Sequence, residues 1–289
     1  MGQHPFDYDR AFSRNLGFIT VEEREIIKNK KIAIAGLGGV GGIHLITLVR
    51  MGFQKFHLSE FDEYEIHNFN RQYGANMTTL NAKKLDVMVE RAKEINPNIE
   101  VKLFPDGVNA KNVDQFLEGV DLYLDGLDLF ATEARQIVFK TCYVLNIPAS
   151  TVAPIGMGAA LINFLPGKMS FDEYFGFDSD QYRNAIKLVV GLSPKFPHLK
   201  SLVDRSYANL KQQKTSSTPM GVMLSAGVIG TETIKILLNR GPITYAPTSI
   251  HFDSYLNRIF KTTTWFGCRN WIFRFKVIFL ERMLRKLSS

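Results

Sequence analysis

Cysteine is scarce in this chain of 289 residues, where Cys142 and Cys268 are the only two. Two isolated cysteines cannot supply the ligands of a structural zinc cluster and suggest no disulfide framework, so we expect a cytoplasmic protein without zinc. The first fifteen residues lack the apolar stretch of a signal peptide. Residues 32–49 are apolar enough to suggest a membrane span, but five glycines and His44 interrupt them, which favours a strand, a turn and a helix.

Most of the chain also lacks a basic footprint for nucleic acid. The formal net charge is +7, but residues 265–289 alone carry six basic residues and one acidic residue. That segment accounts for +5, which leaves only +2 for all the residues before it. Because the body is nearly neutral, we predict no nucleic-acid partner.

The first half of the chain has the alternation expected of an α/β protein. Short apolar segments typical of strands alternate with segments typical of helices, which predicts a parallel sheet covered on both faces. We therefore predict a Rossmann-like, doubly wound and mainly parallel sheet. The predicted strands cover 31–35, 56–60, 100–105, 121–124 and 147–151, and the predicted helices cover 41–51, 82–95, 113–117 and 131–145.

The second half departs from this alternation. Small and apolar residues predict a buried helix over 220–238, and short apolar segments predict a strand at 156–164 and antiparallel strands at 250–253 and 258–264. No internal repeat or low-complexity linker separates the halves, so we predict one domain. It covers residues 1–264, with a nucleotide-binding core at about 30–155, an inserted substrate lobe at about 165–220 and a basic, aromatic tail at 265–289.

A glycine-rich loop, GLGGVGG at residues 36–42, links the first predicted strand to the first predicted helix. Glycine lets the backbone approach a phosphate closely, and the following helix N-terminus favours an anion. A plain tight turn between strand and helix is the alternative. Glu60, at the end of the next strand, favours a nucleotide, because a carboxylate there accepts hydrogen bonds from ribose hydroxyls, as in an NAD enzyme. The loop glycines are Gly36, Gly38, Gly39 and Gly41.

Two cations after the second strand favour ATP over NAD. Arg71 ends the segment Asn68-Phe69-Asn70-Arg71, and Lys84 lies thirteen residues further on. Cleavage of ATP needs cations that hold the β- and γ-phosphates and spread the charge of the leaving pyrophosphate, whereas hydride transfer needs none near the adenosine. The alternative is that both residues are solvated surface cations.

An aspartate, Asp128, follows the fourth predicted strand. The carboxyl ends of the strands form the ligand crevice in such sheets, and a carboxylate there can hold Mg²⁺ against phosphates. The alternative for Asp128 is a turn or a helix cap.

These motifs resemble the ThiF/MoeB/HesA family, which shares its adenylation domain with the enzymes that activate ubiquitin-like proteins. The resemblance rests on GLGGVGG at 36–42, EFDEYEIHNFNRQ at 60–72, Lys84 and Asp128. It covers roughly residues 10–165 and, less clearly, the small-residue helix near 220–238. It implies an ATP-dependent adenylyltransferase. A substrate carboxylate, such as the C-terminus of a ubiquitin-like protein or peptide, attacks the α-phosphorus of ATP and releases pyrophosphate.

The resemblance also implies cofactors and residue roles. ATP and Mg²⁺ are the implied cofactors, and the implied assembly is a homodimer in which Arg14 reaches the ATP of the partner subunit, with Arg10 as the fallback. The other implied contacts are Glu60 and Asp62 with the ribose, Asn70, Arg71 and Lys84 with the phosphates, and Asp128 with Mg²⁺.

The chain departs from some relatives in its cysteines. Cys142 lies inside a predicted helix, where a buried inert thiol is favoured over a nucleophile, and no motif surrounds Cys268. We therefore expect adenylation without an enzyme thioester. Arg135, seven positions past Asp128, receives no role. A non-catalytic nucleotide-binding scaffold is the main alternative function, and an NAD-dependent oxidoreductase is a remote one.

The tail mixes six aromatic residues with its basic ones, and its longest uninterrupted apolar run, 277–280, cannot span a bilayer. On a helical wheel these aromatics do not gather on one face, which weakens the interpretation as a membrane anchor. We favour docking of the tail on the body or on a dimer partner over contact with a membrane surface.

Overall fold

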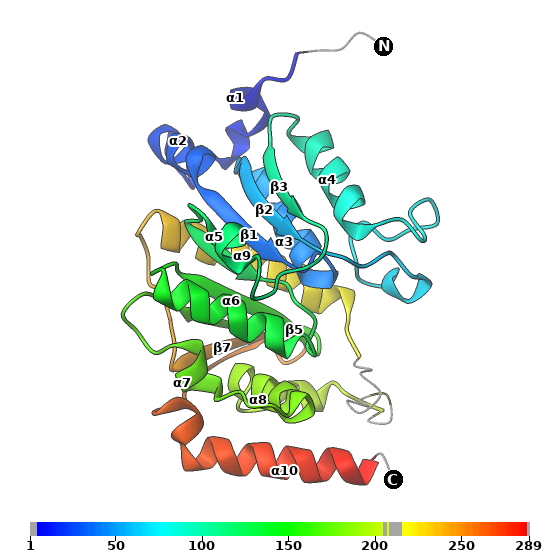
Figure 1. Ribbon diagram of the computed structural model, residues 1–289, viewed down its shortest axis with the longest axis vertical. Helices are drawn as coiled ribbons and strands as arrows, with labels where there is room; N and C mark the ends of the chain where they lie inside the picture. The colour runs from blue at the N-terminus through cyan, green and yellow to red at the C-terminus, as the bar shows by residue number, and fades with distance from the viewer. Residues whose placement is uncertain (1–4, 205–206, 208–215, 288–289) are drawn as a thin grey trace.

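The computed structural model describes residues 5–204, 207 and 216–287. One eight-stranded sheet runs through it with strand order β3-β2-β1-β4-β5-β6-β7-β8 (Figure 1). The first five strands in this order are parallel, and β5 to β8 are antiparallel. This confirms the predicted mainly parallel sheet with antiparallel C-terminal strands. The strands are β1 Lys31–Ala35, β2 Lys55–Ser59, β3 Glu100–Phe104, β4 Leu122–Asp125, β5 Ala149–Ile155, β6 Gly158–Phe164, β7 Thr248–Asp253 and β8 Arg258–Thr263.

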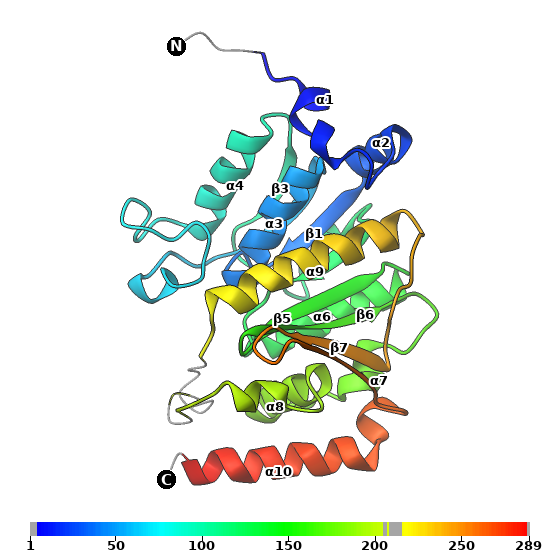
Figure 2. The same ribbon diagram turned by 180° about the vertical axis from the view of Figure 1, so that it is seen from behind.

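Helices cover both faces of the sheet (Figures 1 and 2). Alternate residues of β1 divide the core: Ile34 faces one cluster, which includes residues of α3, α4 and α9, while Ala33 faces the other, which includes residues of α5, α6, α7 and α8. The bounds are α1 Tyr8–Ala11, η1 Ser13–Asn15, α2 Val21–Asn29, α3 Gly39–Met51, η2 Ile66–Asn68, α4 Lys84–Ile95, α5 Val113–Leu117, α6 Thr132–Val144, α7 Phe171–Phe175, α8 Gln181–Leu192, η3 Pro197–Lys200, α9 Pro219–Leu237, η6 Gly267–Arg269 and α10 Trp271–Leu287.

The hairpin between β5 and β6 differs from the sequence prediction. The sequence predicts a strand that begins at residue 156, but β5 continues to Ile155 and β6 begins at Gly158. Gly156 has a φ of +65°, a left-handed conformation that reverses the chain there. Thr218, at the N-terminus of α9, donates its hydroxyl to the Gly156 carbonyl at 2.8 Å. The hairpin is therefore fixed against the start of α9.

The predicted buried helix at 220–238 corresponds to α9. By length and composition alone, α9 could cross a membrane, but half of its most apolar window is buried. It packs on α3, β5 and β6 (Figure 2). A Cβ on Gly230 would lie 3.1 Å from the Thr47 side chain of α3, so a small residue at this position keeps the two helices close. Its apolar composition is thus that of a core helix.

The C-terminal tail forms one helix, α10, which lies along the outer side of α8 (Figures 1 and 2). Phe273, Val277, Leu280 and Leu284 of α10 are buried in a cluster with residues of α8. Their spacing of four, three and four residues keeps them on one side of the helix. The tail therefore docks on the body through one face, although its aromatic residues as a set do not share that face.

A buried histidine in α3 predicts loss of stability in acid. His44 is fully buried, neither ring nitrogen has a hydrogen-bond partner among the described residues, and burial lowers the pKa of His44 from 6.5 to about 3. Below pH 6.5 the unfolded chain therefore binds a proton that the folded chain excludes, and the free energy of unfolding falls as the pH drops towards about 3. Between pH 7 and pH 5 this side chain costs about 2 kcal/mol.

We expect His44→Leu to remove this cost. Urea unfolding at pH 7 and pH 5 measures it, and the stability loss of the variant should be about 2 kcal/mol smaller than that of the parent protein. Equal losses in the two proteins would show that His44 is not the source.

Candidate active site

Three glycines bring the carboxyl ends of β1 and β4 into contact. A Cβ on Gly36 would lie 2.4 Å from the carbonyl oxygen of Gly126, and a Cβ on Gly41 would lie 1.7 Å from the carbonyl oxygen of Gly36. Gly36 also has a φ of +81°. The N-terminus of α3 therefore begins directly beside the end of β4. From here the chain adds β2 and β3 on one side of the sheet and β5 on the other, and such a reversal point is where open α/β sheets bind ligands.

This close contact makes Gly41→Ala a destabilising change. The added methyl group must push the backbone of residue 36 away, and we expect a loss of about 3 kcal/mol in the free energy of unfolding. Gly39→Ala is the matched control in the same turn, because its Cβ would meet nothing closer than 3.6 Å. Urea unfolding of both variants measures the difference. Similar midpoints would contradict the tight junction.

Glu60, which follows β2, is buried and anchors the glycine loop. Its Oε2 accepts the N–H of Leu37 at 2.8 Å, and its Oε1 accepts the N–H groups of Phe61 and Asp62 at 2.9 and 3.0 Å. Each carboxylate oxygen has two acceptor positions, so one remains on Oε2 for a hydroxyl group. The structure thus gives Glu60 a loop-fixing contact that its position in the sequence did not reveal.

Asp62 and Lys84 form an ion pair. Their Oδ2 and Nζ atoms lie 3.0 Å apart, and the backbone N–H of Lys84 donates to the Asp62 carbonyl at 2.9 Å. The lysine side chain is only 7% exposed, whereas that of Asp62 is 51% exposed. The chain between them folds back through Tyr64, whose N–H donates to Ala82. An expected ribose contact and an expected phosphate contact therefore lie side by side, and the ammonium group retains two further donors.

Arg71 lies over the start of α3. A Cβ on Gly39 would lie 3.8 Å from its Cγ, and its Nη1 donates to the His67 carbonyl at 3.0 Å and to Asn70 Oδ1 at 2.9 Å. Burial lowers the pKa of Arg71, while the negative charge of Asp128 raises it, so the two charges interact across the loop. The cation, the helix N-terminus and the carboxylate thus lie at the same end of the sheet.

Asn70 and Gln72, on either side of Arg71, have different surroundings. Asn70 Nδ2 donates to the Ser217 carbonyl at 2.9 Å and so ties this segment to the approach to α9. Its amide therefore positions Arg71 and also holds α9. Gln72 is buried beside Gly38, where a Cβ would lie 3.6 Å from its Nε2. Gln72 received no role from the sequence, although it belongs to the motif at 60–72.

Asp128 is exposed at the mouth of the β4–α6 connection, and its Oδ1 accepts the N–H of Phe130 at 2.9 Å. Arg135, for which the sequence analysis predicts no role, stabilises this connection. Its Nε pairs with Asp125 Oδ2 at 2.8 Å, and its Nη2 donates to the carbonyls of Leu127 and Asp128 at 2.6 and 3.0 Å. Both members of the ion pair are buried. The only indication in the sequence is the placement of Arg135 in the helix after the strand.

Arg14 lies at the far end of α3 from the glycine loop of its own chain. Its neighbour Asn15 donates Nδ2 to the carbonyl of Arg50, in the last turn of α3, at 2.9 Å. Because α3 has 13 residues, the two ends are about 20 Å apart. Arg14 is exposed and within one chain is not part of this site.

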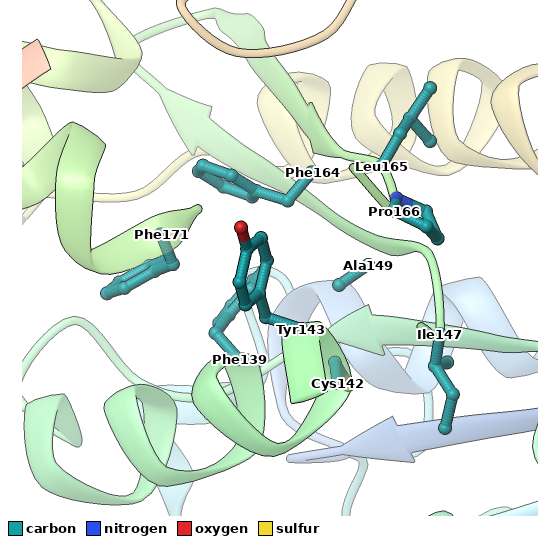
Figure 3. Close-up of a pocket in the computed structure, with 9 residues that line it drawn as sticks. All are labelled: Phe139, Cys142, Tyr143, Ile147, Ala149, Phe164, Leu165, Pro166 and Phe171. Carbon is teal, nitrogen blue, oxygen red and sulfur yellow. The ribbon is translucent and has the colours of Figure 1, made fainter. Parts of the chain in front are cut away.

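An apolar hollow lies at the opposite edge of the sheet, where β5 begins and β6 ends (Figure 3). Cys142 is one of its lining residues, and burial raises the pKa of this thiol, which keeps it protonated and inert. The glycine loop follows the carboxyl end of β1, and β5, which is parallel to β1, begins at the hollow, so the hollow lies at the opposite end of the strands and is not the nucleotide site. Its lining residues are Phe139, Cys142, Tyr143, Ile147, Ala149, Phe164, Leu165, Pro166 and Phe171.

Comparison with known proteins assigns the chain to a family. A family model described as "ThiF family" matches residues 12–267. The chain belongs to the ThiF family. This confirms the resemblance drawn from the glycine loop and the motif at 60–72, and the match continues past α9 to residue 267.

Curated relatives of this ThiF chain have several names. tRNA threonylcarbamoyladenosine dehydratase of Bacillus subtilis is 36% identical over 107 residues, which are 37% of this chain and 42% of the relative. HesA of Leptolyngbya boryana is 29% identical over 142 residues, or 49% of this chain and 50% of the relative. The chain thus spans half or less of the length of these relatives.

Solved structures show the same fold. Escherichia coli MccB with succinimide superposes with a TM-score of 0.67 at 18% identity, covering 93% of this chain and 76% of MccB. The E. coli tRNA dehydratase TcdA gives a TM-score of 0.58 at 20% identity, covering 80% of this chain and 95% of TcdA. MccB has also been solved with ATP, and TcdA with AMP.

Proposed function

We propose that this ThiF protein is an ATP-dependent adenylyltransferase that activates a substrate carboxylate. The observation that carries the proposal is the placement of Arg71, Asp128 and the N-terminus of α3 at the same end of the sheet. An anion-binding helix end with a cation on one side and an exposed carboxylate on the other suits a magnesium–polyphosphate complex. The ATP and AMP found with MccB and TcdA support this choice of nucleotide.

In the proposed reaction an oxygen of the substrate carboxylate bonds to the α-phosphorus of ATP. The bond from that phosphorus to the oxygen bridging to the β-phosphate breaks, and pyrophosphate leaves with the electron pair. Arg71 and Lys84 neutralise the charge on the leaving group, and the N–H groups at the start of α3 hold phosphate oxygens. Glu60 and Asp62 are the proposed ribose contacts, and Asn70 orients Arg71 beside the phosphates.

Asp128 is the proposed magnesium ligand. The described residues hold no group of three or more histidine, cysteine, aspartate or glutamate side chains that could bind a metal. A single exposed carboxylate still fits Mg²⁺, which takes one or two carboxylates and completes its shell with phosphate oxygens and water. The ion would supply charge neutralisation at the phosphates. Arg135 would fix Asp128 through the carbonyls that it holds.

We further propose a homodimer in which Arg14 completes the site of the partner subunit. Its position at the far end of α3 leaves it without a role in its own chain's site. The proposed substrate is the C-terminus of a ubiquitin-like protein or a peptide. One support is the similarity to ubiquitin-like modifier-activating enzyme 5 of Culex quinquefasciatus, which is 32% identical over 96 residues, or 33% of this chain and 23% of that enzyme. A second support is a solved complex of MccB with MccA.

Complementation tests the shared site. Arg14→Ala and Arg71→Ala should each be nearly inactive alone. Mixing equal amounts under conditions that exchange subunits should restore about a quarter of the parent activity, because half of the dimers then contain one intact site of two. Measuring pyrophosphate release from ATP with a panel of peptide carboxylates reports this. Failure of the exchanged mixture to recover would exclude action of Arg14 across the dimer.

A further inference from the structure

The outer face of α10 presents aromatic side chains to solvent. Trp271, Phe275 and Phe279 are each more than half exposed, and the preceding turn adds Trp265 and Phe266, at 66% and 74%. Figures 1 and 2 show α10 at one end of the molecule, outside α8, with its outer side turned away from the rest of the chain. Several large exposed aromatic side chains on one short segment indicate a contact surface rather than ordinary surface scatter.

Two series of residues with the same spacing divide α10 into opposite sides. The buried series is 273, 277, 280 and 284, and the series 271, 275, 278 and 282 has the same spacing displaced by two residues. Two residues turn an α-helix by about 200°, so the second series lies opposite the docked side. It consists of Trp271, Phe275, Ile278 and Arg282, all exposed. We call this series, with the neighbouring Phe279, the outer aromatic face.

The charges around this face are positive. Arg282 lies within it and Arg274 beside it, and both are exposed. Glu281 is the only acidic residue in α10. Lys276 instead turns back and donates its amine to the Pro194 carbonyl at 2.6 Å, where it helps hold α10 on the body. The outer aromatic face therefore combines aromatic side chains with exposed arginines.

We propose that the outer aromatic face of α10 binds the surface of an anionic lipid bilayer. Aromatic side chains on one side of a helix, with arginines among them, are what an interfacial helix inserts at the headgroup level, and anionic headgroups complement the arginines. A second copy fits poorly, because pairing two such faces would set arginines against a face without an acidic residue. The docked side of α10 keeps the rest of the chain attached, so binding would place the ThiF domain on the membrane.

The chain contains its own reporter for this contact, since Trp265 and Trp271 are its only tryptophans, both are exposed, and Trp271 belongs to the outer aromatic face. Titrating the full chain with vesicles of phosphatidylcholine and phosphatidylglycerol should shift tryptophan emission to shorter wavelength, and the protein should sediment with the vesicles. Pure phosphatidylcholine should give at least tenfold weaker binding, and 0.5 M salt should weaken binding to the anionic vesicles.

Two sets of variants separate the contributions. The change Phe275→Ser with Phe279→Ser should lower vesicle binding at least tenfold, and Arg274→Gln with Arg282→Gln should lower it about 30-fold. Phe18→Ser and Arg50→Gln are matched controls, because both residues are exposed away from α10 and should leave binding unchanged. All these positions are exposed, so urea unfolding should be unaffected.

Three results would overturn the proposal. The first is that the protein sediments but its tryptophan emission does not change when vesicles are added. The second is equal affinity for neutral and anionic vesicles. The third is an emission shift that rises with protein concentration in the absence of lipid and is accompanied by a larger species in gel filtration. That last outcome would assign the face to a second copy of the chain.

Discussion

Arg71→Ala is expected to weaken ATP binding about a hundredfold while changing AMP binding by less than about threefold. The guanidinium group lies over the N-terminus of α3, where the β- and γ-phosphates are proposed to bind. Each hydrogen bond between charged groups contributes about 1.5 kcal/mol or more, so two lost bonds to ATP amount to about 3 kcal/mol, or a hundredfold in affinity. AMP lacks the β- and γ-phosphates, so the substitution should change its affinity little.

Isothermal titration with ATP and with AMP, both with Mg²⁺, measures this ratio. Arg50→Ala is the matched control, because Arg50 is an exposed arginine in the last turn of the same helix. It should leave both affinities unchanged. A loss of equal size for ATP and AMP would place Arg71 at the nucleoside or indicate general damage to the loop, and no loss for either would leave it a surface cation.

Arg135→Ala is expected to lower the free energy of unfolding by about 3–5 kcal/mol. The change removes a buried guanidinium group and leaves the carboxylate of Asp125 buried without its ion-pair partner. It also frees the carbonyls of Leu127 and Asp128, so the connection that carries the proposed magnesium ligand loses its support. The variant should therefore also bind Mg²⁺–ATP more weakly.

A double-mutant cycle in urea tests this explanation. Asp125→Leu combined with Arg135→Met replaces the charges by apolar groups of similar size and should recover most of the stability lost in Arg135→Ala. Magnesium-dependent ATP binding should stay weak in this double variant, because the carbonyls of residues 127 and 128 would still lack their hydrogen-bond donor. If the effects of Asp125→Leu and Arg135→Met alone add up to the effect of the double change, the two side chains are not coupled.

The parallel sheet could be predicted because strands and helices of its nucleotide-binding half alternate with clear changes of period, and the glycine loop lies between two of them. The side of the sheet that each β1 residue faces also follows from simple alternation, as Ile34 and Ala33 show. The turn at Gly156 could not be placed, because the apolar residues on both sides continue the strand pattern across it.

Tertiary contacts decide the rest of the site. The sequence places Arg135 on a helix but does not show that its side chain reaches Asp125, and Glu60 shows its bond to Leu37 only when β1 and β2 lie side by side. In α10, aromatic residues occupy both the docked and the outer sides, so the apolar pattern by itself hides which side packs. Only the burial of residues 273, 277, 280 and 284 in the cluster with α8 shows that residues 271, 275, 278 and 282 form the exposed side.

The most direct test of the proposed chemistry is exchange of labelled pyrophosphate into ATP, measured with peptide carboxylates and Mg²⁺. Acyl adenylate formation is reversible, so the protein should incorporate label into ATP only when the accepted carboxylate is present. Asp128→Asn should lower the rate at least a hundredfold and should leave the urea midpoint unchanged. Release of ADP and phosphate, or exchange that survives Asp128→Asn, would contradict the proposed adenylation by this site.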